Sequence, residues 1–347
     1  MTGIRTPQIS VVIPAFNAAD FVLASVASVL DGTCADLEVI CVDDGSTDDT
    51  AALLEGLAAT DGRVSVVRLG ANCGASVARN EGIERSIGAF LFFLDADDTV
   101  PQGALDLLLS AARQTQSELV IGKLLWFRTE AEVASPNREG ASGPIRIERF
   151  RESLHLQAVQ GCHCCNLYSR TLLEQHRIRY PVDLTYGEDQ LFQATAMVKA
   201  EEFAVIDDIV YCYHHYRAQS LTRKPPSLKN LLDDIEFQRR IARLFSNHGM
   251  DETGLRFLST WSYSISNYWL QIPNVISRRE ASIFFSSFRA MAGEFGVSSW
   301  SESMPADHRY LLGLVMSGMD DAAVAFLAAL ATGSPSSIKL SPCADLS

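Results

Sequence analysis

FLFFLDADD, residues 90–98, joins a run of apolar side chains to three carboxylates, Asp95, Asp97 and Asp98. The apolar run predicts a buried strand, and unpaired carboxylates at its end are unfavourable unless a cation or strong donors neutralise them. Carboxylate oxygens are hard ligands that suit Mg(II) or Mn(II). The alternative is a solvated turn, because aspartate is also common in turns and at helix N-caps. The stretch therefore predicts a buried strand that ends either in a metal-binding site or in a polar turn.

The composition indicates a globular protein with room for two domains. Of 347 residues, 47% are hydrophobic and 20% are charged, and single cores stop growing at about 250–300 residues. The net charge of −13, from 29 basic and 42 acidic side chains, argues against a polyanion binder and predicts no nucleic-acid partner. No early apolar run reaches the roughly 18 residues of a membrane span, and residues 1–8 lack an apolar signal region, which predicts a cytoplasmic protein.

Strands alternate with helices from Ile9 to Phe127. Apolar runs at 9–16, 37–44, 64–69 and 89–94 predict strands, with Pro14 stopping the first, and helical spacing is found at 21–30, 46–57 and 80–86. This alternation predicts an α/β fold, a mainly parallel sheet flanked by helices. In such a sheet the ligand lies at the carboxyl ends of the strands.

Three of the predicted strands end in polar residues, at 14–17, 43–46 and 95–98. Between them, Gly74 permits close backbone approach, and Arg79 is a fork-shaped donor suited to phosphate or carboxylate. Arg79 also fits an ordinary charge on a helix surface. The sequence has no GxGxxG after the first strand and no GxxxxGK[ST]. A nucleotide would therefore be held by carboxylates at its base and ribose and by a metal at its phosphates.

Four segments, in order, resemble the bacterial family 2 glycosyltransferases, inverting enzymes with a GT-A fold. They are SVVIPAFNAADFVLASVASVL (10–30), EVICVDDGSTDDT (38–50), NCGASVARNEGI (72–83) and FLFFLDADD (90–98). Four blocks in the right order are more specific than one short pattern. The resemblance implies a GT-A-type, Rossmann-like sheet that binds a nucleotide-sugar donor, expected to be a UDP-sugar, together with Mn(II) or Mg(II).

The resemblance also assigns roles to residues of these segments. It makes Asp44 the carboxylate that reads the uracil ring, with Asp43 as its supporting neighbour. It makes Asp97 the principal metal ligand, with Asp95 or Asp98 contacting ribose or completing the metal site, and the order between these two stays open. The remaining donor-site residues that it implies are Pro14, Ala15 and Phe16 in the loop bordering the nucleobase, with Asn17, Gly74, Arg79 and Ala96.

A second informative region contains GEDQLF at 187–192. This motif resembles the acceptor-side ED motif of the family, which makes Asp189 the general base that removes a proton from the acceptor hydroxyl, with Glu188 beside it. Like-charge proximity and partial burial can raise the pKa of one of the two acids. Both acids also suit the N-terminus of a helix over 189–200, where the helix dipole favours negative charge. The two interpretations are compatible.

Histidines and cysteines give two weaker signals. YCYHHYRAQSLT, residues 211–222, resembles the family's tyrosine-rich strand and basic loop, in which a histidine of some members completes the metal shell or touches the diphosphate. His214 and His215 are therefore candidates, although His-His-Tyr stands where Arg is often found, and surface histidines are the alternative. The cluster CHCC at 162–165 lacks a second ligand pair at zinc-site spacing, so buried small side chains are the preferred interpretation.

The expected domains follow from these motifs. A GT-A domain is predicted over 1–225, with a nucleotide-sugar-binding half at 1–127 and an acceptor half at 128–225. An α-helical C-terminal domain is predicted over 226–332, with helices at 228–245, 252–270, 277–295 and 307–331, and a disordered tail at 333–347.

The implied activity is metal-dependent, inverting transfer of a sugar from a nucleotide-sugar donor to a saccharide or lipid-linked saccharide in glycan synthesis. Peripheral association with the inner face of the plasma membrane and the oligomeric state stay open. Two other functional classes share features with this chain. A catalytically degenerate GT-A scaffold would be expected to lose acids, whereas Asp44, Asp97 and Asp189 are all present. A nucleotidyltransferase would carry a glycine-rich basic loop after the first strand, where this chain has PAFNAAD.

Overall fold

The computed structural model describes residues 6–32, 36–127, 129, 143–150, 163–214, 225–249, 269–297 and 306–331. The chain folds into two compact units, Met1–Ser220 and Leu221–Ser347. Each unit is described by itself. His215 and the tail at 333–347 lie outside the described residues, as does nearly all of the helix expected over 252–270. The domain boundaries expected from the sequence stay predictions.

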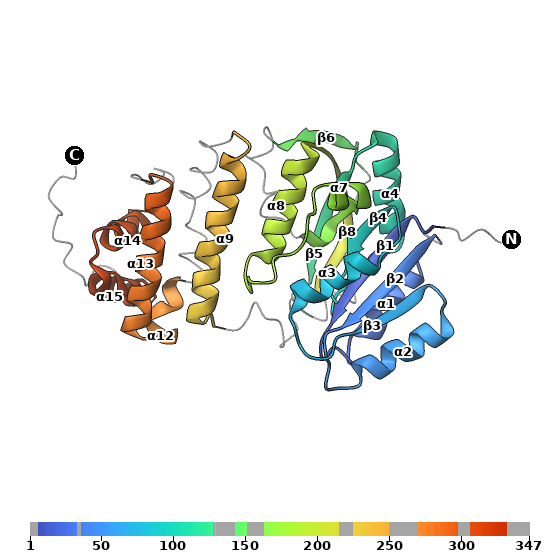
Figure 1. Ribbon diagram of the computed structural model, residues 1–347, viewed down its shortest axis with the longest axis horizontal. Coiled ribbons are helices and arrows are strands. Elements are labelled where there is room, and N and C mark those ends of the chain that lie inside the picture. Colours follow the sequence, from blue (N-terminus) through green and yellow to red (C-terminus); the bar gives the residue numbers. More distant parts are fainter. Residues whose placement is uncertain are drawn as a thin grey trace. The chain divides into compact units, whose positions relative to one another are not determined.

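In its described residues the first unit forms an eight-stranded sheet (Figure 1). The strands are β1 (Ile9–Ala15), β2 (Leu37–Asp43), β3 (Val64–Arg68), β4 (Phe90–Phe93), β5 (Leu119–Phe127), β6 (Arg146–Arg149), β7 (Asn166–Ser169) and β8 (Glu202–His214), in the spatial order β3-β2-β1-β4-β7-β5-β8-β6. The pairs β1/β2, β1/β4, β2/β3 and β5/β8 are parallel, whereas β4/β7, β5/β7 and β6/β8 are antiparallel. The predicted mainly parallel α/β sheet is confirmed.

Helices flank both faces of this sheet, and those described are α1 (Val22–Leu30), α2 (Thr50–Thr60), α3 (Ala75–Arg85), α4 (Ala104–Thr115), α7 (Arg170–Gln175) and α8 (Glu188–Ala200), with a 3₁₀ turn η2 (His163–Cys165). Alternate residues of β1 face opposite ways, as the period of a strand requires. Ile9, Val11 and Ile13 lie in a core with residues of α1 and α4. Val12 faces α3, where a Cβ added to Gly82 would overlap with Cγ1 of Val12. That glycine allows α3 to pack closely on the sheet.

Pro14 does not stop the first strand, contrary to the sequence-based prediction. β1 continues to Ala15, and Pro14 pairs in register with Val42 of β2. The ladder between β1 and β4 ends at Val12 and Phe93. Residues two apart in a strand point their backbone groups the same way, and the carbonyl of Val12 faces β4. The N–H that Pro14 lacks would therefore also face β4, but beyond the end of that ladder. Pro14 thus removes no hydrogen bond from the sheet.

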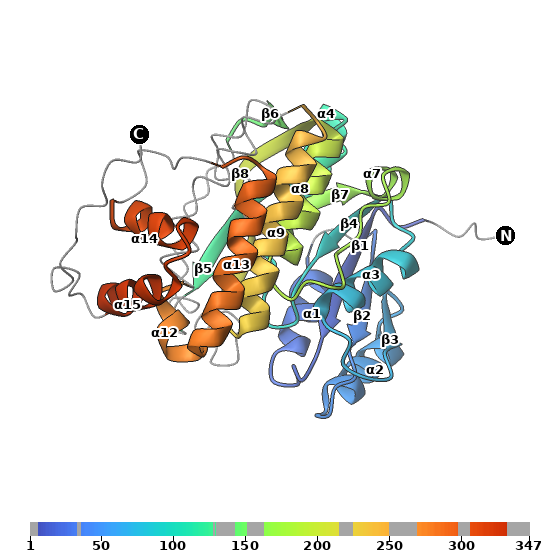
Figure 2. The same cartoon turned by 60° about the vertical axis from the view of Figure 1, so that its left-hand side comes forward.

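The second unit consists, in its described residues, of α9 (Leu228–Ser246), a 3₁₀ turn η4 (Trp269–Gln271), α12 (Ile272–Val275), α13 (Arg278–Glu294), α14 (Ala306–Met316) and α15 (Asp320–Ala331). Its apolar core surrounds the fully buried Trp269, and Figure 2 shows α9 and α13 side by side. Ser227 and Ser277 form capping boxes at the starts of these two helices. The single helix expected over 307–331 is wrong, because Gly318, at a φ of 73°, separates α14 from α15.

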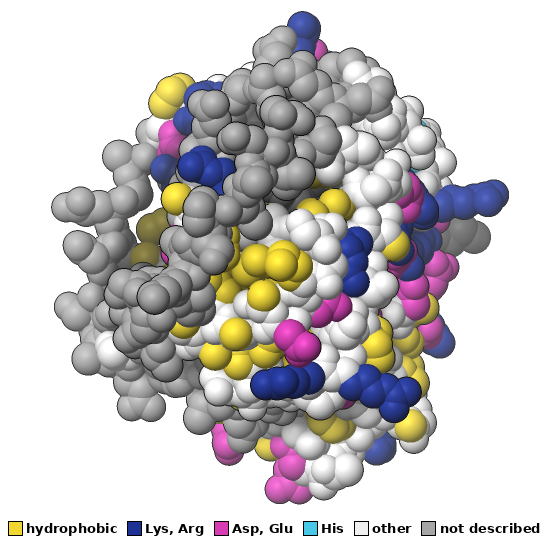
Figure 3. All heavy atoms as spheres, turned by 90° about the vertical axis from the view of Figure 1, so that its left-hand side faces the viewer, with side chains coloured by type: hydrophobic (Ala, Val, Ile, Leu, Met, Phe, Trp, Pro, Cys, Tyr) yellow, Lys and Arg dark blue, Asp and Glu magenta, His cyan; other side chains and the backbone are white. Residues whose placement is uncertain are grey.

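Two observations concern membrane spans and surface charge in the described part of the chain. No described helix is both long and apolar enough to cross a bilayer. In the space-filling view of Figure 3, hydrophobic side chains gather in a patch, and basic and acidic side chains are dispersed around it. Charges of both signs are therefore interspersed on that face.

Candidate functional site

The loops that follow β1 and β2 are hydrogen-bonded to each other. Asn17, at a positive φ of 48°, accepts a hydrogen bond at Oδ1 from the backbone N–H of Thr47 at 2.8 Å. The backbone N–H of Asn17 donates to Oγ of Ser46 at 3.0 Å. Because β1 and β2 are parallel neighbours, their carboxyl ends lie at the same edge of the sheet. Two of the three predicted strand-end groups therefore form one connected surface.

The residues predicted to border the nucleobase differ in exposure. Pro14 and Ala15 are buried within β1, whereas the Phe16 side chain is 44% exposed. An exposed aromatic ring offers an apolar face on which a base can stack. Of these three residues, Phe16 is therefore the one placed for direct contact, and the assignment itself stays a prediction.

Asp44 holds the loop that leads into α3. Its Oδ1 accepts a hydrogen bond from the backbone N–H of Cys73 at 2.7 Å, and its Oδ2 accepts one from Gly74 at 2.8 Å. Gly74 has a φ of 95°, and the space beside its Cα is open, so a ligand can approach its backbone. Asp43 accepts from the N–H of Ser46 at 3.3 Å, and its Oδ2 has no hydrogen-bond partner among the described residues. Base recognition by Asp44 stays a prediction, and shaping this loop is a further task of the same carboxylate.

The three carboxylates that follow β4 lie in different surroundings. Asp98 is 1% exposed, and its oxygens accept hydrogen bonds from the hydroxyl of Tyr211 at 2.7 Å and the backbone N–H of His214 at 2.8 Å. Asp95 and Asp97 are only partly buried, whereas Ala96 between them is buried. Both oxygens of Asp98 are engaged within the protein, and Oδ1 of Asp95 accepts from Arg79 at 2.8 Å. Which of the two acids accompanies Asp97 stays a prediction.

Negative charge accumulates at this edge of the sheet. Burial, and then the charges of Asp95 and Asp97, raise the pKa of Asp98 to about 8. A divalent cation would relieve this repulsion. Among the described residues, no three His, Cys, Asp or Glu side chains form a group that could hold a metal ion. The oxygen donors fit Mg(II) or Mn(II), which proteins often bind through one or two carboxylates, with water and substrate phosphates completing the shell.

His214 lies close to the acids but faces other neighbours. Its Nε2 is 3.1 Å from Oγ1 of Thr99, and its buried ring lies 5.3 Å from that of Phe127. Thr99 also exchanges two backbone hydrogen bonds with Cys212, which fasten the turn after β4 to β8. The arrangement gives His214 a structural place beside Asp98, and a metal-ligand role for either histidine stays a prediction.

Arg79 joins the acids after β4 to the acids at the start of α8. Its Nη2 donates to Oδ1 of Asp95 at 2.8 Å, and its Nη1 lies 3.7 Å from Oε1 of Glu188. The guanidinium lies over the ring of Tyr180, 5.2 Å from the ring centroid, in a cation–π contact. Burial opposes ionisation of Asp95, but the charge of Arg79 holds the pKa of that carboxyl below its usual range. Arg79 is 6% exposed, so the surface-charge alternative is wrong.

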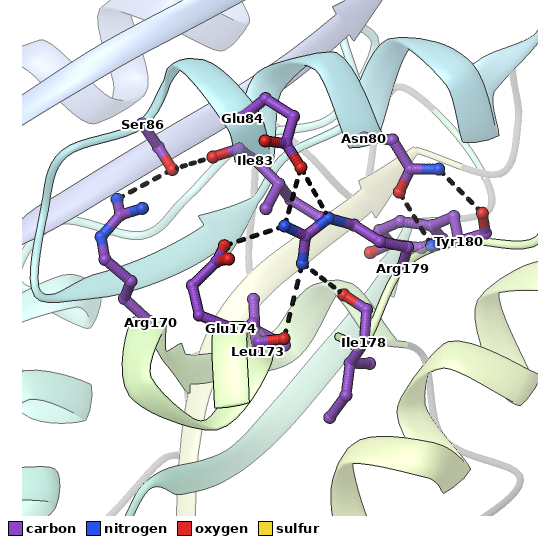
Figure 4. Close-up of polar contacts among 10 residues, drawn as sticks. All are labelled: Asn80, Ile83, Glu84, Ser86, Arg170, Leu173, Glu174, Ile178, Arg179 and Tyr180. Carbon is purple, nitrogen blue, oxygen red and sulfur yellow. Dashed lines mark hydrogen bonds and ion pairs between the residues drawn. The ribbon is translucent and has the colours of Figure 1, made fainter. Parts of the chain in front are cut away.

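The segment that carries Tyr180 is fastened to α3 (Figure 4). The backbone N–H of Tyr180 donates to Oδ1 of Asn80, and Nδ2 of Asn80 donates to the carbonyl of Tyr180, both at 2.8 Å. Beside them, Arg179 donates to Glu84 of α3 at 2.7 Å and to Glu174 of α7 at 2.9 Å. These contacts hold the chain leading to α8 against the helix that supplies Arg79.

Glu188 and Asp189 begin α8, as the sequence predicts for the helix. Asp189 accepts at Oδ1 from the backbone N–H of Gln190 at 2.7 Å, and its side chain is 33% exposed. Burial, and then the charge of Asp189, raise the pKa of Glu188 to about 7. Burial also opposes ionisation of Asp189, but His163 and then Arg79 hold the pKa of that carboxyl below its usual range. Of the two carboxyls, Asp189 is therefore the one whose charged form the surroundings favour.

His163 is a residue of this site that the sequence analysis did not assign to it. Its ring is 2% exposed in η2, and its Nδ1 lies 3.5 Å from Oδ2 of Asp189. Cys164 and Cys165 beside it are buried, as expected; Cys165 is a free thiol, whereas Cys164 is disulfide-bonded. No local pattern links 163 with 189, because the two residues meet only after β7 and α7 have reversed the chain direction.

A family model described as "Glycosyl transferase family 2" matches residues 10–177. The match includes all three strand-end groups and His163, and it ends before Glu188 and Asp189. The chain belongs to glycosyltransferase family 2. The resemblance stated from the sequence is confirmed, and the protein is a glycosyltransferase.

Two of the curated proteins similar to this chain come from Bacillus. The chain is 29% identical over 247 residues to the uncharacterized glycosyltransferase EpsJ of Bacillus subtilis (strain 168), and the matched region covers 70% of this chain and 70% of EpsJ. It is 28% identical over 209 residues to the poly(ribitol-phosphate) beta-glucosyltransferase of Bacillus spizizenii, and this match covers 59% of this chain and 32% of the relative. The chain thus spans about a third of that relative's length.

Two solved structures share the fold of this chain. TarS 1–349 of S. aureus in complex with UDP-GlcNAc has a TM-score of 0.72 at 20% identity, with 94% of this chain and 92% of that chain covered. The mannosyltransferase PcManGT from Pyrobaculum calidifontis, in complex with GDP-Man and Mn²⁺, has a TM-score of 0.52 at 14% identity, with coverage of 93% and 88%. The predicted GT-A-type fold is therefore confirmed.

Proposed function

We propose that this glycosyltransferase moves a sugar from a UDP-sugar to a hydroxyl group of a saccharide or lipid-linked saccharide, with inversion at the anomeric carbon. One observation carries the proposal: Arg79 contacts Asp95 of the donor-side acids at 2.8 Å and lies 3.7 Å from Glu188 of the acceptor-side acids. The charge of Asp189 also acts on Asp95. The two motifs therefore surround one guanidinium, although the sequence separates them widely.

The comparisons support the donor and the kind of product. TarS was crystallised with UDP-GlcNAc, and the relative from Bacillus spizizenii is named for glucosyl transfer to poly(ribitol-phosphate). By extension, we propose that this chain acts in the synthesis of a polysaccharide or cell-wall polymer and that its donor carries uridine diphosphate. The exposed Phe16 and the open backbone beside Gly74 suit the base and the phosphates of such a donor.

The proposed reaction needs a base on the acceptor side. The acceptor oxygen attacks the anomeric carbon as the bond to the diphosphate breaks, and Asp189 takes the proton from the attacking hydroxyl. Asp189 suits this role because, against the effect of burial, His163 and Arg79 hold the pKa of its carboxyl below the usual range, and one third of its side chain is exposed. Asp97, with Asp95, would hold Mn(II) or Mg(II), which when bound stabilises charge on the departing diphosphate. Arg79 orients Asp95 and Glu188 between the two sides.

The test combines binding and turnover. Thermal unfolding is measured with UDP, GDP and dTDP sugars, each with and without Mn(II), because a ligand at 100 times its Kd stabilises by about 2.7 kcal/mol. Release of nucleoside diphosphate is then followed without an acceptor. We expect UDP-sugars to stabilise the protein and to be hydrolysed slowly, both dependent on metal. Stabilisation by GDP-sugars alone, or turnover that does not depend on metal, would overturn this assignment.

A further inference from the structure

The polar imidazole of His163 is buried among aromatic rings. The imidazole lies 5.5 Å from the ring of Tyr180 and 6.2 Å from that of Phe93, and it is 2% exposed. The hydroxyl of Tyr168 donates to the carbonyl of His163 at 2.9 Å and fixes the turn that carries it. A side chain held from three sides in this way has little rotational freedom.

A carboxylate lies beside the imidazole. Its Nδ1 lies 3.5 Å from Oδ2 of Asp189, and within the described residues neither ring nitrogen has a hydrogen-bond partner. Buried polar groups are normally satisfied, so an unpartnered imidazole aimed at a carboxylate requires an explanation. A shift of a few tenths of an ångström would bring Nδ1–H within hydrogen-bond distance of that oxygen.

We propose that His163 is a positioning residue, which donates Nδ1–H to Oδ2 of Asp189 and fixes the carboxylate in the orientation that receives the acceptor's proton. This inference rests on the proposed role of Asp189 as the general base. With Oδ1 held by the N–H of Gln190 and Oδ2 held by His163, rotation of the carboxylate about its χ2 bond is restricted. Catalysis by a base depends on such geometry, because small misplacements of a reacting group can lower the rate by about 10²-fold.

Two substitutions separate positioning from packing. His163→Phe keeps an aromatic ring at this position and removes the donor. His163→Asn places an amide N–H near the position of Nδ1 and leaves a void where the rest of the ring lay. A packing role predicts that the Phe variant resembles wild type and that the Asn variant is worse. A positioning role predicts the reverse for kcat, while thermal unfolding reports the loss of packing separately.

The measurements are kcat, KM and Tm for the UDP-sugar that the screen selects. We expect His163→Phe to lower kcat about 10- to 100-fold with KM within about twofold. We expect His163→Asn to retain kcat within about fivefold despite a lower Tm. If the Asn variant fails to fold, His163→Gln is the second donor variant. The proposal is overturned if His163→Phe keeps wild-type kcat, or if the folded amide variant loses as much kcat as the Phe variant.

A double variant that combines His163→Phe with Asp189→Asn separates the proposed role of His163 from the proposed role of Asp189. If His163 acts through Asp189, adding His163→Phe to Asp189→Asn should change the residual kcat by less than about twofold. A further loss of tenfold or more in the double variant would show that His163 acts elsewhere. If Asp189→Asn itself keeps wild-type kcat, the proposed base is wrong, whatever His163 does.

Discussion

The acids after β4 and the acids at the start of α8 show similar pKa shifts but differ in one respect. In each group a cationic or polar side chain from elsewhere in the chain lowers the pKa of one acid, Arg79 for Asp95 and His163 for Asp189. In each group burial and neighbouring charges raise the pKa of another, Asp98 to about 8 and Glu188 to about 7.

The difference lies in what surrounds the acid whose pKa is raised. Asp98 is enclosed by the hydroxyl of Tyr211 and the backbone N–H of His214. Glu188 lies 3.7 Å from the guanidinium of Arg79, with which it forms an ion pair within the described part of the chain. The comparison teaches that similar clusters of carboxylates can serve different ends. Asp98 is hydrogen-bonded into the fold, whereas Glu188 lies beside Arg79 and its pKa is raised to about 7.

The largest expected effect concerns the acids of α8. Asp189→Asn removes the base while keeping its shape, so kcat should fall by about 10²–10⁴ and donor binding should remain nearly unchanged. Turnover and UDP titrations on the same preparations check this. Glu188→Gln is the matched control in the adjacent position, and an equal loss of kcat in both variants would contradict the assignment of Asp189 as the base.

The next effect sharpens the contrast within the acids after β4. Asp97→Ala should abolish most of the Mn(II)-dependent stabilisation by UDP, which is about 2.7 kcal/mol for wild type at 100 times Kd. Its unfolding free energy without ligand should change by no more than about 0.5 kcal/mol, because the side chain is only partly buried. Thermal unfolding with and without UDP and Mn(II) measures both. Unchanged stabilisation by UDP and metal would contradict a ligand role for Asp97.

Asp98→Ala should show the opposite behaviour. Removing its carboxylate leaves the hydroxyl of Tyr211 and the N–H of His214 without their acceptor, and each unsatisfied buried group costs about 1–3 kcal/mol. We expect a loss of about 2–4 kcal/mol in unfolding free energy, measured by denaturant titration. A variant as stable as wild type would mean that Asp98 is not part of the structural frame.

The smallest effect is a pH dependence that comes from Glu188. Its pKa is raised in the folded protein to about 7, so between about pH 4.5 and 7 the folded state binds a proton that the unfolded state has released. Glu188 therefore stabilises the fold least above pH 7, and wild type loses stability as the pH rises through this window.

Glu188→Gln should remove this contribution. The stability of the variant relative to wild type should increase by on the order of 1–3 kcal/mol between pH 5 and pH 8. Denaturant unfolding of both proteins at the two pH values measures the difference, and any constant effect of the substitution cancels. A difference that does not change with pH would show that the pKa of Glu188 is not raised.

Much of the fold could be predicted because its signals are local. The run FLFFL predicted β4, and the polar groups at 14–17, 43–46 and 95–98 marked the carboxyl ends of parallel strands. The errors came where a distant partner decided the outcome. Pro14 continues β1 because β4 stops short of it, and Gly318 divides an apolar stretch that reads as one helix. The same holds for the candidate site. The residues of the motifs could be named from the sequence, but the residues that contact them in the fold could not.

The sequence alone determined the alternating strands and helices, the family, and the identity of the acids, because burial patterns and motif spacing are written along the chain. Only the tertiary structure decided that Arg79 is buried between Asp95 and Glu188, that Asp98 is closed off by Tyr211, and that His163 faces Asp189. The physical reason is that charge, burial and hydrogen bonding depend on distances through space, and chain reversals bring together residues whose separation in sequence carries no signal.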